Sequence, residues 1–492
     1  MKGKVSLAKL IAPIFTGLFV YACSYIFADY SVLSMNAWIF VSIFAALVVG
    51  LILEPMPPAF LGIIAIALAV LFKVGPVKSG EVGAKISAEA AINWGLTGFS
   101  NSVVWLIFAS FMIGIGYQNS GLGKRIALIL VNKLGKSTLG LGYAIAIADL
   151  ILAPFIPSNA ARSGGTIYPI AMSIPTMYDS SPEKEPRKVG AYIAWVSLAT
   201  TCISSSIFLT GQAPNPLALE ILSKSGIAVV DWMGWFLCFL PVGIILFLIT
   251  PLLTYYIYPP EVKGSSKISA WAKEELAKLG SIKPKELLML SISVLALILW
   301  IGSKKFGVSA TTTALIVIVL MIVTNIITWN DFLANKPAWN VLTWFATLVT
   351  MAGGLKNVGF LDFLSKYTDS LLSGFSPTTA VFVLLLVFCL LRYFFASGTA
   401  YVTAVVGVFA IIAGKIEGFD ASFIMMFLLA PMGMISVLTP YGTGHSPIWF
   451  ASGYIKGSEF WKLGAIFGAI YLLIYTLIAY PWFKFIIPHI FS

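Results

Sequence analysis

Long apolar runs, each close to the length of a membrane-spanning helix, recur along almost the whole chain of 492 residues. A helix needs roughly 20 mostly apolar residues to cross the hydrocarbon core of a bilayer. Hydrophobic residues make up 59% of the chain and charged residues only 10%, a balance that excludes a soluble protein with a large core. We therefore expect an all-α polytopic membrane protein.

The apolar runs predict about 11 transmembrane helices. The segment 78–93 is instead polar at every third or fourth residue, which is typical of an amphipathic helix on the membrane surface. A second surface helix is expected after the basic turn Lys124-Arg125. The expected spans begin near residues 11, 37, 58, 101, 189, 231, 287, 308, 340, 420 and 461.

The formal net charge of +11 could indicate a polyanionic partner. The basic residues lie in loops between apolar runs, however, as the positive-inside rule for membrane proteins predicts. The loop 259–286 holds six lysines and is therefore placed in the cytoplasm. The count of crossings then places the N-terminus in the cytoplasm too. We expect a multi-pass protein of the plasma membrane, and no nucleic-acid partner is expected.

The four cysteines all lie inside apolar runs and show neither CxxC spacing nor metal-ligand spacing with histidine. They are expected to be buried small side chains, and no metal ion or cofactor is expected. The chain also lacks an HExxH motif and a phosphate-cradling loop with its lysine. A membrane-embedded enzyme is therefore not favoured.

Two short polar stretches, 157–162 and 396–401, interrupt apolar runs with small hydroxyl, amide and glycine residues. Each stretch lies between two apolar limbs, over 138–178 and 377–413, that are barely long enough to cross a bilayer. Such irregular backbone is tolerated inside a membrane only where it faces protein or a wet cavity. The pattern predicts two re-entrant hairpins with these stretches as their tips.

Two further spans are broken, at 210–216 and 439–447, where prolines and glycines cannot continue a helix. The order of hairpin and broken span is thus the same in both halves, and an odd number of expected crossings separates them. Inverted repeats with broken helices at corresponding positions predict a substrate site near the middle of the membrane. A channel needs neither the hairpins nor the repeat, and chance similarity of small-residue motifs is the alternative to a repeat.

The tips and breaks would present half-helix N-termini, whose free N–H groups and positive dipole ends favour an anion. Hydroxyl and amide side chains around them can donate hydrogen bonds to carboxylate oxygens without adding charge. The arrangement suits a small polar anion. The candidate substrate-binding residues are Ser158, Asn159, Thr210, Gly211, Asn215, Ser397, Gly398, Thr399, Pro440 and Thr443.

Four charged or titratable residues, Asp149, Arg162, Arg392 and His445, lie inside the apolar stretches. Each is costly at that depth and is expected to be paired or to face a cavity. Arg162 either forms a structural salt bridge with Asp149 or acts as a fixed cation beside the substrate. Arg392 could support the second hairpin, and His445 is either bonded to a backbone carbonyl or charged.

The residues Pro157-Ser158-Asn159-Ala160-Ala161-Arg162, Ser397-Gly398-Thr399 and Thr439-Pro440-Tyr441-Gly442-Thr443-Gly444 resemble the divalent anion/sodium symporter (DASS) family, over nearly the whole chain. The resemblance implies a homodimer of di- or tricarboxylate carriers with a fixed scaffold and an elevator-type transport domain. It divides the chain into 1–137 and 231–376 (scaffold), 138–230 and 377–457 (transport domain) and 458–492 (last helix).

The family signature is Ser-Asn-Thr at each tip, and here Ala160 and Gly398 each replace one member. Arg162 and His445 lie where they could replace bound sodium as the positive charge near the substrate. A fixed cation of this kind would hold back the empty carrier, because an uncompensated charge is costly in lipid. Together with the sequence of the first tip, these two cations resemble the exchanger branch of the family. We expect sodium-independent exchange of succinate, malate, fumarate or 2-oxoglutarate; the alternative is a sodium-coupled di-/tricarboxylate symporter.

Overall fold

The computed structural model describes residues 7–26, 33–76, 86–264, 266–368 and 374–491. This part of the chain is helical, and its one β-type contact is an isolated bridge between Ser137 and Gly264. The expectation of an all-α protein is therefore confirmed. The first half of the expected surface helix 78–93 lies outside the described residues, and the helix α4 (Ala88–Gly95) begins in its second half.

Each expected span is present as an apolar helix. Within the described ranges, nine helices are long and apolar enough to cross a membrane, one of them being the first limb of the second hairpin. Three expected spans are shorter, so the number of crossings stays a prediction. The long spans are α1 (Leu7–Ile26), α2 (Met35–Leu53), α5 (Ser102–Ser120), α9 (Gly190–Ile207), α11 (Trp232–Ile257), α13 (Pro284–Ile301), α17 (Lys336–Asn357) and α23 (Gly457–Phe491), and the short ones are α3 (Pro58–Leu71), α15 (Ala310–Val323) and α21 (Ala421–Leu429).

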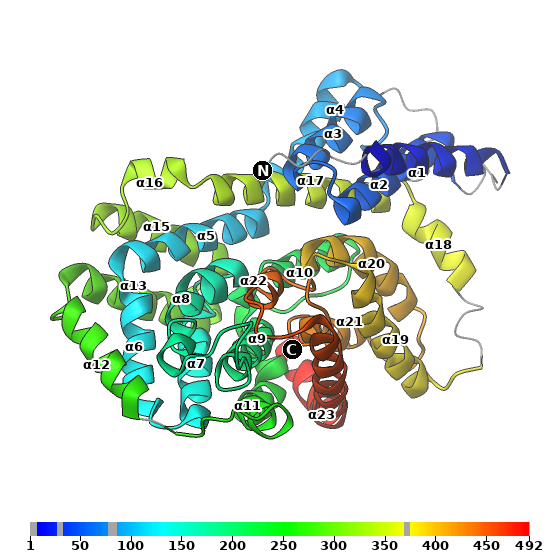
Figure 1. Ribbon diagram of the computed structural model, residues 1–492. Helices are drawn as coiled ribbons and strands as arrows, with labels where there is room; N and C mark the ends of the chain where they lie inside the picture. The colour runs from blue at the N-terminus through cyan, green and yellow to red at the C-terminus, as the bar shows by residue number, and fades with distance from the viewer. Residues whose placement is uncertain (1–6, 27–32, 77–85, 265, 369–373, 492) are drawn as a thin grey trace.

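Helices α1 to α4 gather at one end of the molecule, and α6 and α12 lie side by side at the other (Figure 1). The helix α12 lies within the loop 259–286 that connects two expected spans, and the sequence analysis did not predict it. Its Ile268 and Ala272 are buried while its lysines face outward, as in an amphipathic helix packed on a neighbour. The remaining elements outside the hairpins are η1 (Thr97–Ser100), α6 (Leu122–Leu134), α12 (Ser266–Leu279), α14 (Ser303–Phe306), α16 (Trp329–Ala334) and α18 (Phe360–Thr368).

The first hairpin consists of α7 (Thr138–Leu152), the tip, and a limb built from η2 (Ala160–Ile167), α8 (Tyr168–Ala171) and η3 (Pro175–Tyr178). Both of its outer ends meet the same loop. At the start of the hairpin, the Thr138 N–H donates to the Lys263 carbonyl at 3.1 Å; beyond its end, the Lys188 carbonyl accepts from the Val262 N–H at 3.1 Å. The chain therefore enters and leaves at one face, as expected for a re-entrant hairpin.

The second hairpin consists of α19 (Pro377–Leu391), η5 (Arg392–Phe394), the tip and α20 (Gly398–Ala413). Its outer ends both lie near the C-terminal part of α23, where the Tyr480 hydroxyl is 3.5 Å from the Thr378 hydroxyl and the Lys484 ammonium lies 5.9 Å from the centre of the Phe419 ring. The opposite end of α23 carries Glu459, which accepts from the Tyr258 hydroxyl beside the first hairpin's loop. The two hairpins therefore open toward opposite ends of α23.

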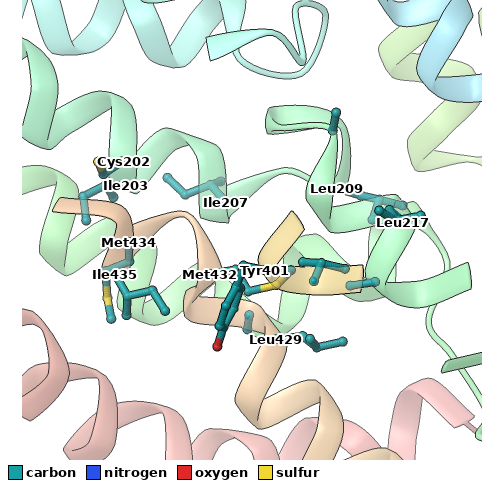
Figure 2. Close-up of a cluster of buried hydrophobic side chains, with 14 of the residues drawn as sticks. Cys202, Ile203, Ile207, Leu209, Leu217, Tyr401, Leu429, Met432, Met434 and Ile435 are labelled. Atoms are coloured by element: carbon teal, nitrogen blue, oxygen red, sulfur yellow. The ribbon is translucent and has the colours of Figure 1, made fainter. Parts of the chain in front are cut away.

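The two expected helix breaks are confirmed. In the first, α9 is followed by η4 (Leu209–Gly211) and α10 (Pro214–Lys224); in the second, α21 is followed by η6 (Ala430–Met432), η7 (Met434–Leu438) and α22 (Ser446–Ala451). The second break starts earlier than expected, because the helix tightens from residue 430, next to Pro431. Figure 2 shows the apolar cluster between these segments, with Met434 and Ile435 close to Cys202 and Ile203 of α9.

Gly433 allows the second break to approach the backbone of α9. A Cβ at this position would lie 2.7 Å from the Ser206 nitrogen and 2.8 Å from the Ser205 carbonyl carbon, and backbone atoms cannot move aside as a flexible side chain can. We expect Gly433→Ala to lower the free energy of unfolding by about 1–3 kcal/mol, the usual cost of overpacking. Thermal unfolding of the purified protein in detergent measures this change.

Gly407→Ala is the matched control, because a Cβ there meets no atom within 4 Å and alanine is a better helix former than glycine. We expect this control to unfold at the same temperature as the wild type or slightly above it. Equal unfolding temperatures for Gly433→Ala and the wild type would contradict the close approach.

Candidate functional site

Each hairpin tip lies against the helix break of the other half. At the first tip, the Asn159 amide donates to the Thr443 hydroxyl in the second break at 2.9 Å. At the second tip, a Cβ added to Gly398 would lie 3.0 Å from Cγ of Pro214, the first residue of α10 after the first break. The structure thus brings together residues that are far apart in the sequence.

The two tip serines have the same local role. The Ser158 hydroxyl oxygen accepts from the Ala161 N–H at 3.2 Å, and the Ser397 hydroxyl oxygen accepts from the Ala400 N–H at 3.4 Å. Both oxygens therefore cap the limb that follows. Since each oxygen is an acceptor in these bonds, the O–H of each serine stays available to donate to a carboxylate.

Unpaired polar atoms cluster where the first tip meets the second break. Within the described part of the chain, four buried atoms here have no hydrogen-bond partner: Asn159 Oδ1, Thr439 Oγ1, His445 Nδ1 and Ser446 Oγ. Buried polar atoms in proteins nearly always have a partner, so a cluster of this kind marks a place where a polar ligand or water binds. Thr439 belongs to the hydroxyl groups that the sequence places at the second break, whereas Ser446 was not among the candidate residues.

His445 is fixed by its other ring nitrogen. Nε2 lies 3.2 Å from the Leu198 carbonyl of α9, and because a carbonyl oxygen only accepts, Nε2 carries the proton of this hydrogen bond. The geometry agrees with the first of the two alternatives for this residue, a break histidine bonded to the backbone. Its role in charge compensation stays a prediction.

Arg162 is completely buried and all its donors are used. Its Nε donates to Asp149 Oδ1 at 3.1 Å, within a salt bridge between the two limbs of the first hairpin. Its Nη1 donates to the carbonyls of Ile156 and Gly211, and its Nη2 donates to two serine hydroxyls of α9. Because Asp149 neutralises the guanidinium, the structure does not support the expected role of Arg162 as a free cation beside the substrate.

Three candidate residues of the first break hold the backbone in place instead of presenting free groups. The Thr210 hydroxyl donates to the Pro154 carbonyl at 2.6 Å and accepts from the Trp232 indole at 3.1 Å. The Asn215 amide donates to the Ser205 and Phe208 carbonyls. Gly211 lies so close to α9 that a Cβ there would be 2.9 Å from the Ser204 carbonyl oxygen. Of the remaining candidates, Thr399 is buried, and Pro440 is half-buried beside Tyr441.

Sequence reasoning missed the three consecutive serines of α9. Ser204 donates to Asp149 and accepts from Arg162, Ser205 accepts from Arg162, and the Ser206 hydroxyl accepts from the Met434 N–H at 2.9 Å. The signal was visible, since three hydroxyls in a row are unusual inside an apolar span. Through these hydrogen bonds, the three serines attach the first hairpin and the second break to the buried helix α9.

The first tip also borders a cavity. A cavity of about 550 Å³ lies between Ser158, α5 and the start of α17, and this volume falls within the range of about 300–1,000 Å³ that is usual for ligand pockets. Its charged lining residue is Asp331, which would repel an anion. This carboxylate argues against the cavity as the anion site itself.

The fold and the site define a multi-pass membrane transporter, and comparisons with known proteins give its family. The family profile described as "Sodium:sulfate symporter transmembrane region" matches residues 4–488. The chain belongs to this family, which confirms the resemblance to the divalent anion/sodium symporters.

The chain is similar to proteins named L-tartrate/succinate antiporter. It is 42% identical to those of Escherichia coli K12 and Shigella flexneri over 455 residues, which cover 92% of this chain and 93% of each relative. Two solved structures share the fold at 13% identity: the YdaH transporter of Alcanivorax borkumensis (TM-score 0.55, 87% of this chain and 98% of that one) and MtrF of Neisseria gonorrhoeae (TM-score 0.56, 88% and 96%).

The buried ion pair should be sensitive to loss of its carboxylate. We expect Asp149→Asn to lower the free energy of unfolding by about 3–5 kcal/mol, because the substitution leaves the Arg162 guanidinium buried without a counter-charge. Thermal unfolding of the purified protein measures this loss. Glu274→Gln breaks an exposed ion pair with Lys278 and serves as the control, with little change expected. A loss no larger than that of the control would contradict the structural role of the pair.

Proposed function

We propose that this protein is a secondary transporter that exchanges C4 and C5 dicarboxylates across the plasma membrane without sodium. The observation that carries the proposal is the similarity over nearly the whole chain to L-tartrate/succinate antiporters. The contacts between hairpin tips and helix breaks support the proposal, because serine O–H groups that are free to donate and unpaired polar atoms lie there. Succinate and L-tartrate are the first substrates to test, followed by malate, fumarate and 2-oxoglutarate.

Transport follows an elevator mechanism in this proposal. The segments 138–230 and 377–457 form the moving transport domain, and the remaining spans form the scaffold. The hydrogen bond between Asn159 and Thr443 and the bond from the Met434 N–H to the Ser206 hydroxyl support this division, since both join the two segments into one unit. A homodimer through the scaffold completes the proposal.

The two halves of the chain are proposed to be inverted repeats. The hairpins open toward opposite ends of α23, which supports opposite insertion. The loops around 179–188 and 259–264 are hydrogen-bonded to each other through the Arg187 carbonyl and the Glu261 N–H at 3.2 Å. Their basic residues therefore lie at one face, which supports a cytoplasmic position for this face and for the N-terminus.

Sodium-coupled symport is the second candidate, because the description of the family itself names sodium. The two candidates differ in what neutralises the substrate. A symporter carries the compensating cation with the substrate, whereas an exchanger keeps a fixed positive charge that impedes the return of the empty carrier. Arg162 is paired with Asp149, so an exchanger of this sequence needs a different cation.

Uptake of labelled succinate into proteoliposomes tests the proposal. We expect uptake at least tenfold faster with unlabelled succinate or L-tartrate inside than with empty vesicles, and no effect of a sodium gradient. Vesicles without protein are the control. Uptake into empty vesicles driven by sodium would establish the symporter instead, and an absence of uptake under every condition would exclude dicarboxylates as the substrate class.

A further inference from the structure

Arg392 is another buried arginine, located five residues before the second tip serine. Its side chain is 2% exposed, yet only its Nη1 has a hydrogen bond in the described structure, to the Ser397 carbonyl at 3.2 Å. Its Nε is buried without a partner. Among the described residues, no carboxylate lies within ion-pair distance of this guanidinium, whereas Arg162 has Asp149.

The surroundings of Arg392 add positive charge instead of balancing it. The 16-residue helix α20 begins at Gly398, and a Cβ on this glycine would lie 3.2 Å from Arg392 Nη2. The same Cβ would lie 3.0 Å from Pro214, where the 11-residue helix α10 begins. Two helix N-termini, each with a partial positive charge, therefore converge on a cation, an arrangement that favours an anion and is otherwise repulsive.

The protein groups around Arg392 do not supply the missing negative charge. The guanidinium lies 5.1 Å from the centre of the Tyr401 ring, and a cation–π contact is weak beside the cost of burying a charge. The Tyr401 hydroxyl is used elsewhere, since it donates to the Phe388 carbonyl. Figure 2 shows Tyr401 beside Met432 within an apolar cluster. If Arg392 only supported the hairpin, the bond from Nη1 would be enough. That role leaves the unpaired Nε and the uncompensated charge of the guanidinium unexplained.

We propose that Arg392 binds one carboxylate of the dicarboxylate substrate, in a subsite formed with the starts of α10 and α20. The inference rests on the proposed function and assigns to Arg392 the fixed positive charge that Arg162 cannot supply. A planar guanidinium with unused donors suits a carboxylate, which can accept two of its N–H groups at once. The bound dianion neutralises the subsite, and the empty subsite keeps its charge.

The test compares succinate with succinamate, the analogue in which an uncharged amide replaces one carboxylate. In proteoliposomes, we expect the wild type to show a KM at least tenfold lower for succinate than for succinamate. Arg392→Gln should reduce this preference at least tenfold, mainly by raising the KM for succinate. Arg392→Lys should retain part of the preference, because it keeps the charge and loses the planar fork.

Arg187→Gln is the matched control. Arg187 also bonds a carbonyl, that of Pro259, and also lies over a tyrosine ring, that of Tyr258, but it belongs to a loop away from the tips. Its substitution should leave the preference unchanged. A preference retained in Arg392→Gln, equal KM values for the two substrates in the wild type, or equal losses for both substrates in Arg392→Gln would each overturn the assignment.

Gly398→Ala tests the same subsite if Arg392→Gln cannot be purified in a folded state. Its methyl group narrows the gap between Arg392 and Pro214, so the KM for succinate should rise at least tenfold, while Gly407→Ala leaves it unchanged. An unchanged KM in Gly398→Ala would overturn the subsite. A wild-type protein that exchanges no dicarboxylate would instead exclude the proposed function, which separates the two failures.

Discussion

The ion pair between Arg162 and Asp149 holds together the region in which the tips and breaks meet. An arginine inside a membrane protein is tolerated only when its charge is neutralised and its donors are used. Here a single guanidinium joins the two limbs of the first hairpin, the carbonyl of Gly211 in the first break and two serines of α9. The planar shape of the group fixes the directions of these bonds and hence the positions of the segments.

The helix α9 is the element on which the other segments of this region are placed. All of its residues are buried, and its serines bond both the first hairpin and the second break. Gly211 and Gly433 let the two breaks approach its backbone more closely than any side chain would allow. Close packing of this kind makes the tips and breaks one unit and not a set of separate loops.

The hairpins and breaks could be predicted because proline, glycine and small polar residues inside an apolar run leave the backbone few alternatives. The hydrogen-bond and ion-pair partners of each charged residue could not be predicted from the sequence, since they depend on which helix faces pack against each other. Asp149 was visible as a partner for Arg162, but the contribution of Ser204 and Ser205 follows only from the packing of α9 against the hairpin. The helix α12 was missed for a similar reason, because Ile268 and Ala272 become a buried face only when α6 lies against them.

The two hairpins open toward opposite ends of α23 but do not have the same tips. The first carries Asn159, whose amide is bonded to Thr443, and the second carries Gly398, which has no side chain. Under the proposed inverted-repeat arrangement, the substrate passes a different tip on each side of the membrane. The apparent affinity for substrate can then differ between the two faces of the membrane, while the concentration gradients alone set the direction of net exchange.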